Sequence, residues 1–272
     1  MLDREKQLSL VRVLARSGRS QVLQVARGPE RLALKIVFTD GDAQARLAFE
    51  REAAALSGLD HPCVARVIEH GEGPTGLAWL LMPFYDGLSL ADRLRTGRPL
   101  SPRRAVRLFG DYLAGLGALH EAGLVHRDVT PQNLFIARRG KTTRGVVMDL
   151  GRAWSEPTAH ASAGHVAGLP AYLAPEQLLG GRVDARTDVF AAGLCLFEAL
   201  AAKPALSGVG LLDVLDRAVP SLTDVVPRDE LDPISRVIAR ATRLAPDDRW
   251  PDAASFAAAL ARAAGGACEE AA

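Results

Sequence analysis

The chain has 272 residues, of which 48% are hydrophobic and 24% charged, a composition typical of a soluble globular protein with a sizeable core. Its formal net charge of +1 is too small to favour nucleic acid or an acidic membrane surface as a partner. The first nine residues, MLDREKQLS, carry charges of both signs, and the most apolar stretch, residues 189–202, is short and contains Glu198, so we expect no signal peptide and no membrane span. The three cysteines, Cys63, Cys195 and Cys268, have no metal-ligand spacing, which favours a reducing, cytoplasmic location.

The first third of the chain predicts an antiparallel sheet with one helix. Short apolar runs in residues 8–38 are broken by SGRS and RGPE, which is typical of strands joined by turns. Residues 42–59 are rich in Ala, Glu, Arg and Leu and predict a helix. Two more strands are predicted at residues 64–69 and 77–84, on either side of the turn GEGPTG. Together these segments predict five strands and one main helix.

The remainder of the chain is predicted to be mostly helical. A helix is expected to begin at Ser101 and Pro102, a favourable start, and to stop at Gly123. Further helices are predicted at residues 187–200, 211–218, 231–243 and 253–263. We therefore expect one α+β domain at residues 1–265, with a small lobe at 1–84, a hinge at 83–87, a helical lobe at 88–265 and a frayed tail at 266–272.

The segment VHRDVTPQN, residues 125–133, carries the most specific chemical signal. It resembles the catalytic loop of the eukaryotic-like (Hanks-type) serine/threonine protein kinase family, and the Ala- and Arg-rich composition suggests a bacterial member. The resemblance implies a bilobal protein-kinase fold in which Asp128 accepts the proton of the substrate hydroxyl and Asn133 is a magnesium ligand. The spacing of these two residues, in a loop after a helix, makes the match specific.

Two apolar runs after the catalytic loop, residues 134–137 and 145–148, predict a hairpin with a basic tip. Asn133 and Asp149 bracket the hairpin, so antiparallel pairing is expected to bring their side-chain oxygens together. Such hard oxygen ligands suit Mg²⁺, with Mn²⁺ as an alternative, when nucleotide phosphates complete the shell. The triplet DLG that begins at Asp149 resembles the DFG motif of the same family.

In the small lobe, the sequence LALK that ends at Lys35 resembles the VAIK strand of the family. The resemblance implies that Lys35 contacts the α- and β-phosphates of ATP and pairs with Glu52 of the following helix. Glu50 is the alternative partner if the helix register is shifted. The residues that the resemblance assigns to ATP binding are Leu14, Ser17, Gly18, Val22, Ala33, Lys35, Met82, Phe84, Tyr85 and Phe135.

The segment GLPAYLAPEQ, residues 168–177, resembles the family's docking segment for a substrate peptide, which favours protein substrates over small molecules. The resemblance also implies that Asp188 braces the catalytic-loop backbone and that Arg249 pairs with Glu176. Buried charges of this kind require partners, so these roles are expected to be structural.

The sequence departs from the family at several points. The nucleotide loop, residues 14–22, retains only Gly18 where the family has several glycines. Thr130 and Leu169 replace a Lys and a Thr that normally contact each other near the γ-phosphate, so slow turnover is expected. These departures keep open a pseudokinase that acts as a nucleotide-binding scaffold or allosteric regulator, beside the active kinase that the intact catalytic residues favour.

A basic residue before the catalytic aspartate is associated with activation by phosphorylation, because a phosphate can pair with that guanidinium. Arg127 is in this position, and the candidate autophosphorylation sites are Ser155, Thr158 and Ser162, although these could equally be ordinary hydroxyls. The function predicted from the sequence is transfer of the ATP γ-phosphoryl group to Ser or Thr of protein substrates, with Mg²⁺ as cofactor.

Overall fold

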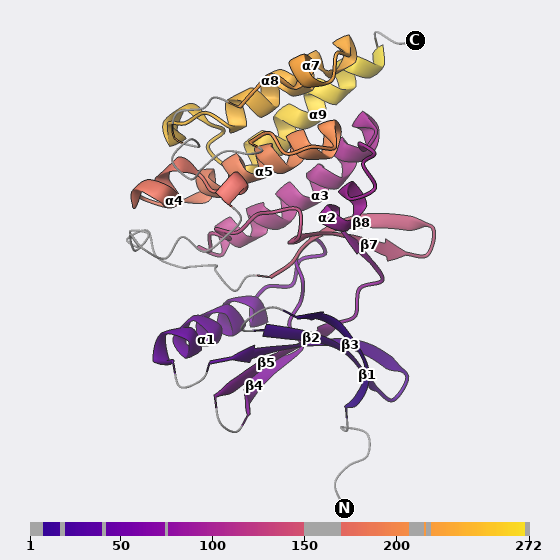
Figure 1. Cartoon of the computed structure of the whole chain (residues 1–272), viewed down its shortest axis with the longest axis vertical. Coiled ribbons are helices and arrows are strands. Elements are labelled where there is room, and N and C mark those ends of the chain that lie inside the picture. Colours follow the sequence, from indigo (N-terminus) through magenta and orange to yellow (C-terminus); the bar gives the residue numbers. More distant parts are fainter. Residues whose placement is uncertain are drawn as a thin grey trace, which may run out of the picture.

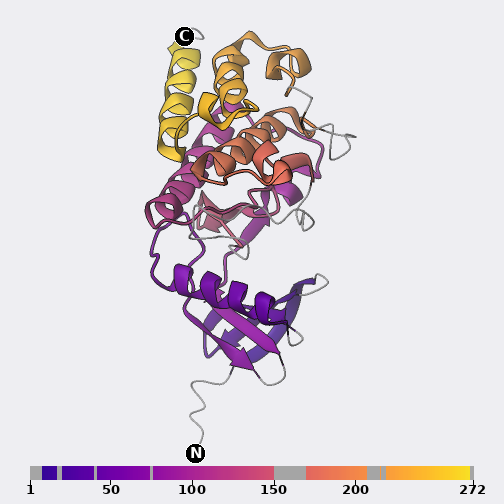
Figure 2. The ribbon, with the colours of Figure 1, turned by 90° about the vertical axis from the view of Figure 1, so that its left-hand side faces the viewer.

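A computed structural model shows a small sheet-rich lobe and a larger helical lobe, stacked along the longest axis of the molecule (Figures 1 and 2). The predicted α+β architecture, with a five-stranded antiparallel small lobe and a mostly helical large lobe, is confirmed. The structure describes the chain except for residues 1–7, 17–19, 40–41, 74–75, 150–169, 207–214, 216–218 and 270–272.

The small lobe is built on an antiparallel sheet with the strand order β1-β2-β3-β5-β4. Alternation along β3 and β5 sends Ala33, Lys35 and Met82 to one face, because these residues lie in matching registers across the pair. The opposite face buries Leu32 and Leu81 in a small apolar cluster. The strands are β1 (Ser9–Arg16), β2 (Ser20–Arg27), β3 (Glu30–Phe38), β4 (Glu69–Gly73) and β5 (Leu77–Pro83).

Helix α1 (Ala43–Ser57) lies beside this sheet and is the predicted main helix of the lobe (Figure 1). Phe49, Ala53 and Leu56 are buried and belong to the large core that continues into the helical lobe. Because one apolar stripe of the helix is shared with that core, α1 is anchored beside the boundary between the lobes.

One strand prediction was wrong. Residues 64–69 were expected to form a strand, but the fourth strand of the sheet is β4, which begins at Glu69. Val64 makes only an isolated parallel bridge to Val147. The actual strand, EHGEG, contains no apolar alternation, and its Gly71 lies against the ring of Trp79 on β5, where a Cβ atom would come within 2.7 Å. The strand therefore depends on its pairing with β5 and not on its own sequence pattern.

A second, three-stranded sheet lies at the start of the helical lobe, in the order β6-β7-β8. The hairpin of β7 (Leu134–Arg139) and β8 (Thr142–Val147) agrees with the prediction. Strand β6 (Gly87–Ser89) was not predicted; it starts where the hinge ends and pairs with β7. Its last residue, Ser89, caps helix α2 (Leu90–Leu94) by accepting a hydrogen bond from the backbone N–H of Asp92.

The helical lobe is centred on two long buried helices, α3 (Pro102–Glu121) and α5 (Ala185–Ala201). Helix α9 (Ala253–Glu269) runs into the segment 266–272 for which a frayed tail was expected. The predicted helix 211–218 falls almost entirely outside the described residues. The remaining helical elements are α4 (Pro175–Leu179), α7 (Leu222–Val225), α8 (Asp232–Ala241) and the 3₁₀ turns Pro170–Tyr172, Asp229–Leu231 and Pro246–Asp248.

Candidate active site

A cleft of about 440 Å³ lies between the small-lobe sheet and the β6-β7-β8 sheet. Its walls are largely apolar, and Lys35, Asn133 and Asp149 also line it. Two of the residues expected to contact ATP, Ser17 and Gly18, lie outside the described residues. The other expected contacts line this one cleft: Leu14, Val22, Ala33, Lys35, Met82, Phe84, Tyr85 and Phe135.

Of the first three hinge residues, Pro83, Phe84 and Tyr85, two have no backbone donor available to this cleft. Pro83 has no N–H group, and the N–H of Phe84 donates to the carbonyl of Arg31 at 3.2 Å. The N–H of Tyr85 is the remaining donor of the three residues, and Tyr85 lines the cleft. Tyr85 is half-buried and lines the cleft, so its N–H is the group of these three residues best placed to bind the edge of a heterocycle.

Lys35 forms an ion pair across the cleft with Asp149, with Nζ and Oδ1 2.6 Å apart. The lysine side chain is 9% exposed, whereas that of Asp149 is 49% exposed. Asp149 has a φ of +57°, a left-handed conformation that is unusual for a non-glycine residue and that marks strain at many functional sites. Strand β3 therefore presents a desolvated cation directly opposite a carboxylate that follows β8.

The predicted pairing of Lys35 with Glu52 falls outside what the structure describes, because the side chain of Glu52 is among the undescribed positions. The alternative partner, Glu50, was wrong. The Glu50 carboxylate accepts a hydrogen bond from Arg46 at 3.1 Å, one turn earlier in α1, and is 47% exposed. It lines a different hollow from the cleft of Lys35.

The catalytic loop holds Asp128 through Asn133. The amide nitrogen of Asn133 donates both to the backbone carbonyl of Asp128, at 2.8 Å, and to its carboxylate, at 3.1 Å. The turn is closed by the Asn133 N–H, which donates to the carbonyl of Thr130 at 2.9 Å. With its nitrogen used in this way, the amide oxygen of Asn133 is the atom that can serve a cation.

Asp188 braces this loop from below, as the resemblance implied. Its side chain is 1% exposed and accepts the backbone N–H groups of His126 and Arg127, each at 2.8 Å, and Nε2 of His120 at 2.8 Å. Arg127 has a φ of +66°, so the backbone turns sharply just before Asp128. Burial alone would raise the pKa of Asp188, but the hydrogen bond and charge of His120 and the N–H of Arg127 hold that pKa below its ordinary value.

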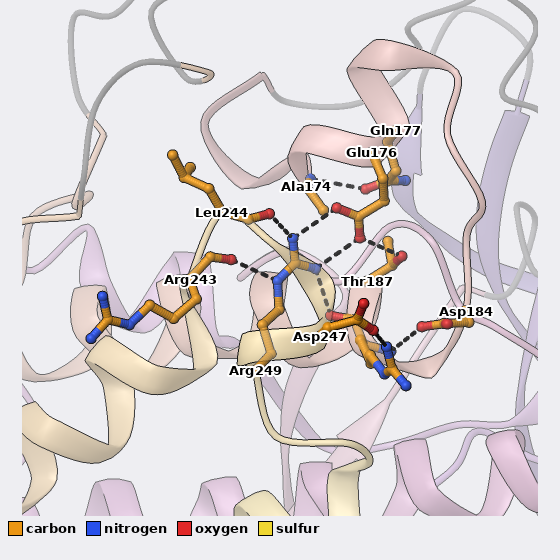
Figure 3. Close-up of polar contacts among 10 residues, drawn as sticks. Ala174, Glu176, Gln177, Asp184, Thr187, Arg243, Leu244, Asp247 and Arg249 are labelled. Carbon is orange, nitrogen blue, oxygen red and sulfur yellow. Dashed lines mark hydrogen bonds and ion pairs between the residues drawn. The ribbon is translucent and has the colours of Figure 1, made fainter.

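Glu176 and Arg249 form the predicted pair in the helical lobe (Figure 3). Two hydrogen bonds of 2.8 Å join the guanidinium to both carboxylate oxygens, and Thr187 donates a third at 2.7 Å. The remaining N–H groups of Arg249 donate to the backbone carbonyls of Arg243, Leu244 and Arg186. A buried charge pair of this kind fixes α4 against α5 and the 3₁₀ turn Pro246–Asp248.

Two contacts of the docking segment, one to the catalytic loop and one to helix α5, were missed by the sequence reasoning. The amide of Gln177 donates to the carbonyl of Arg127 at 2.9 Å, and the hydroxyl of Tyr172 donates to Glu198 on α5. Burial raises the pKa of Glu198, and the hydrogen bond from Tyr172 opposes that rise. A glutamate within an apolar helical run, such as Glu198, was the available signal, because a buried carboxylate requires a partner.

Several remaining predictions and cleft residues complete the description of the site. Thr130, which stands where the family usually has Lys, is 5% exposed and closes the catalytic turn through its carbonyl. Leu169 and the candidate phosphorylation sites Ser155, Thr158 and Ser162 lie outside the described residues. The cleft residues that had not been assigned to ATP or metal binding are Arg12, Ala15, Leu56, Ala65, Leu80, Pro83, Gly87, Leu88, Ser89, Asp92, Gln132 and Met148.

The donor set of the cleft fits a divalent cation that shares its ligands with a phosphate chain. Asn133 and Asp149 are hard oxygen donors that line the same cleft beside Lys35. Within the described part of the chain, no group of three or more His, Cys, Asp or Glu side chains could by itself hold a metal ion. A cation here would therefore need oxygen ligands from a bound phosphate or from water.

The two lobes enclose an apolar slot that leads to the Lys35–Asp149 pair and to the catalytic loop braced by Asp188, an arrangement suited to binding a nucleotide. Sequence comparison identifies the family. The description "Protein kinase domain" matches residues 12–232, and the chain belongs to the protein kinase family. Members of this family use ATP and a divalent metal ion.

The curated relatives are bacterial serine/threonine-protein kinases, as the resemblance implied. The chain is 37% identical to pkn2 of Myxococcus xanthus over 208 residues, 73% of this chain and 25% of that protein. It is 35% identical to PknB of Mycolicibacterium smegmatis, covering 85% of this chain and 38% of that protein. PknB of Mycobacterium tuberculosis is 33% identical over 88% of this chain and 40% of its own length.

The chain thus spans about a quarter to two fifths of the length of these relatives. Over the part of the chain that is described, no helix is long and apolar enough to cross a bilayer.

Proposed function

We propose that this chain is an ATP-dependent protein kinase that transfers the γ-phosphoryl group to Ser or Thr hydroxyls of protein substrates. The observation that carries the proposal is the convergence of Lys35, Asp149 and Asn133 on one apolar cleft, with Asp128 hydrogen-bonded to Asn133 at its edge. Such an arrangement catalyses phosphoryl transfer mainly by positioning and electrostatic stabilisation.

The nucleotide is proposed to bind with its adenine between the small-lobe sheet and Phe135, and with the N–H of Tyr85 donating to the adenine edge. Lys35 would contact the α- and β-phosphates, because it is a desolvated cation that lines the cleft. Its ion pair with the half-exposed Asp149 can rearrange when a phosphate enters, since one partner is already in contact with water.

Asn133 and Asp149 are the proposed ligands of Mg²⁺, with Mn²⁺ as the alternative. The bound cation would neutralise charge on the phosphate oxygens. Asp128 is proposed to accept the proton of the substrate hydroxyl. Asn133 keeps it oriented for this task by donating to its backbone carbonyl and to its carboxylate.

The substrate peptide is proposed to dock on the segment that includes Tyr172 and Gln177. The Gln177 side chain donates a hydrogen bond to the backbone carbonyl of Arg127 in the catalytic loop, so this segment lies next to Asp128. Autophosphorylation at Ser155, Thr158 or Ser162 is part of this proposal. So are a single domain at residues 1–265 and a cytoplasmic location.

The decisive experiment is incubation with labelled ATP, Mg²⁺ and a generic protein substrate, for wild type and Asp128→Asn. We expect the variant to lose at least about a hundredfold in kcat, because the general base is removed. The matched control is Asp247→Asn, which makes the same substitution at an exposed aspartate far along the chain. If wild type and Asp128→Asn transfer equally little phosphate while both bind ATP, the chain is a scaffold and the kinase proposal fails.

A further inference from the structure

Arg31 on strand β3 contacts the hinge residues on both sides of Tyr85, the residue proposed to bind adenine. Arg31 binds both carboxylate oxygens of Asp86, with Nη1 and Oδ1 3.0 Å apart and Nη2 and Oδ2 2.5 Å apart. The same guanidinium lies 5.2 Å from the centroid of the Phe84 ring. The carbonyl of Arg31 also accepts the N–H of Phe84 at 3.2 Å. Arg31 therefore contacts both neighbours of Tyr85 along the chain.

The other end of the hinge is fixed to the helical lobe. The carbonyl of Asp86 accepts the backbone N–H of Arg138 on β7 at 2.6 Å. Gly87 follows with a φ of +151° and pairs with Ala137. A Cβ atom at Gly87 would lie 2.1 Å from the carbonyl oxygen of Ile136, so the close approach of the hinge to β7 requires glycine here. Residues 84–86 are therefore held between this fixed end, at Asp86, and the contacts that Phe84 and Asp86 make with the small lobe.

Arg31 is well suited to fix that orientation. A bidentate arginine–carboxylate pair sets an angle as well as a distance, and a guanidinium over an aromatic ring adds a second contact. The hydrogen bonds and positive charge of Arg31 lower the pKa of Asp86, so the carboxylate is ionised at neutral pH. The side chains of Arg31 and Asp86 are 55% and 49% exposed, and exposed pairs contribute little to global stability. The consequence of the pair is thus local to the hinge.

We propose that Arg31 is a positioning residue for adenine recognition, which holds Phe84 and Asp86 so that the N–H of Tyr85 points into the cleft. The inference rests on the proposed binding of ATP and adds a residue that does not line the cleft itself. It predicts that the loss of Arg31 weakens recognition of the base more than recognition of the phosphates.

The test compares the dissociation constants of MgADP and MgIDP, measured by calorimetry. Inosine has an N–H at the ring position where adenine has an acceptor nitrogen, so it cannot accept the same hydrogen bond from the hinge. For Arg31→Gln we expect the dissociation constant of MgADP to rise roughly three- to tenfold, about the effect of one hydrogen bond, and that of MgIDP to change less than about twofold. Asp86→Asn should behave alike, and the double variant should lose no more than the larger single loss.

Arg27→Gln is the matched control. Arg27 also forms an ion pair on this sheet, with Glu69 at 2.5 Å, but its partners are not hinge residues. We expect this variant to bind both nucleotides as wild type does. An unchanged MgADP affinity in Arg31→Gln, or an equal loss for MgADP and MgIDP, overturns the positioning role. If the wild-type protein binds neither nucleotide, the proposed ATP binding itself fails. That result differs from failure of the positioning role alone, in which Arg31→Gln binds MgADP as tightly as wild type does.

Discussion

The two principal ion pairs of the molecule lie in opposite surroundings. In the helical lobe, the side chains of Arg249 and Glu176 are 0% and 8% exposed and are joined by two hydrogen bonds. At the cleft, Lys35 is 9% exposed but Asp149 is 49% exposed, and Nζ of Lys35 lies 2.6 Å from Oδ1 of Asp149. The first pair is enclosed by protein, whereas the second pair opens to solvent on one side.

This difference separates a structural pair from a functional one. Removing one partner of an enclosed pair leaves a buried charge without compensation. Separating the two partners is therefore costly in free energy, and the pair keeps one arrangement. A pair with one solvated partner can exchange that partner for a ligand phosphate at low cost. The helical lobe therefore fixes the catalytic loop in place, and the small lobe supplies groups that can respond to the nucleotide.

The largest effect is expected when the enclosed pair is broken. Arg249→Met removes the guanidinium but leaves Glu176 buried, with Thr187 as its remaining side-chain donor. We expect the free energy of unfolding to fall by about 3–5 kcal/mol, measured by urea denaturation. The double variant Arg249→Met with Glu176→Leu should recover much of that loss, because it leaves no unpaired charge. A single-variant loss below about 1 kcal/mol would contradict the structural role.

The cleft pair should show the reverse pattern. Lys35→Met keeps an apolar stem of similar length but removes the cation, so we expect kcat to fall about 10²- to 10³-fold. The free energy of unfolding should change by no more than about 1 kcal/mol, because Asp149 remains partly solvated. Phosphate transfer and urea denaturation on the same preparations provide the two measurements. A stability loss as large as that of Arg249→Met would remove the distinction between the two pairs.

Measuring stability against pH extends the comparison to Glu198, a partly buried carboxyl whose surroundings lie between those of the enclosed pair and the cleft pair. Burial raises the pKa of this carboxyl, so the folded state binds its proton more tightly than the unfolded state does. Its contribution to stability is therefore greatest below the unfolded value, about 4.3, and is lost as the pH rises through the folded value. Glu198→Gln can still accept the hydroxyl of Tyr172 and should remove this dependence.

We expect the stability of wild type relative to Glu198→Gln to decline between pH 4 and pH 7, by about 1 kcal/mol or less. Thermal or urea unfolding across that range measures the difference. Parallel curves for the two proteins would show that the carboxyl titrates alike in the folded and unfolded chains. The hydrogen bond from Tyr172 would then balance the cost of burial.

The sequence predicted those elements whose pattern is local. Helix α3 has a favourable start at Pro102 and apolar residues at helical spacing, and the β7–β8 hairpin has two apolar runs around a polar tip. The residues of the catalytic loop were found because their spacing is fixed within one short loop. The frame residues Asp188, Glu176 and Arg249 were found through the family resemblance, and their contacts agree with it.

The features that were missed depend on contacts between distant segments. Strand β4 has no apolar alternation and exists because β5 pairs with it and Trp79 covers Gly71. The three residues of β6 are too short to carry a pattern of their own. The contact of Lys35 with Asp149 joins residues 114 positions apart, and no spacing in the sequence indicated this pair. Periodicity in the sequence therefore predicts helices and strands. Contacts between residues far apart in the sequence can be identified only from the folded structure.

The smallest effect is expected at an ion pair next to the enclosed one. Arg186 pairs with Asp247, but the two side chains are 33% and 90% exposed. The backbone carbonyl of Arg186 accepts a hydrogen bond from Arg249, and this carbonyl is unchanged when the Arg186 side chain is replaced. Arg186→Gln should therefore lower the free energy of unfolding by only about 0.5 kcal/mol in urea denaturation. Because Arg186 and Arg249 adjoin the same turn, a loss of several kcal/mol for Arg186→Gln would mean that proximity to the network, and not enclosure of the charges, determines stability in this lobe.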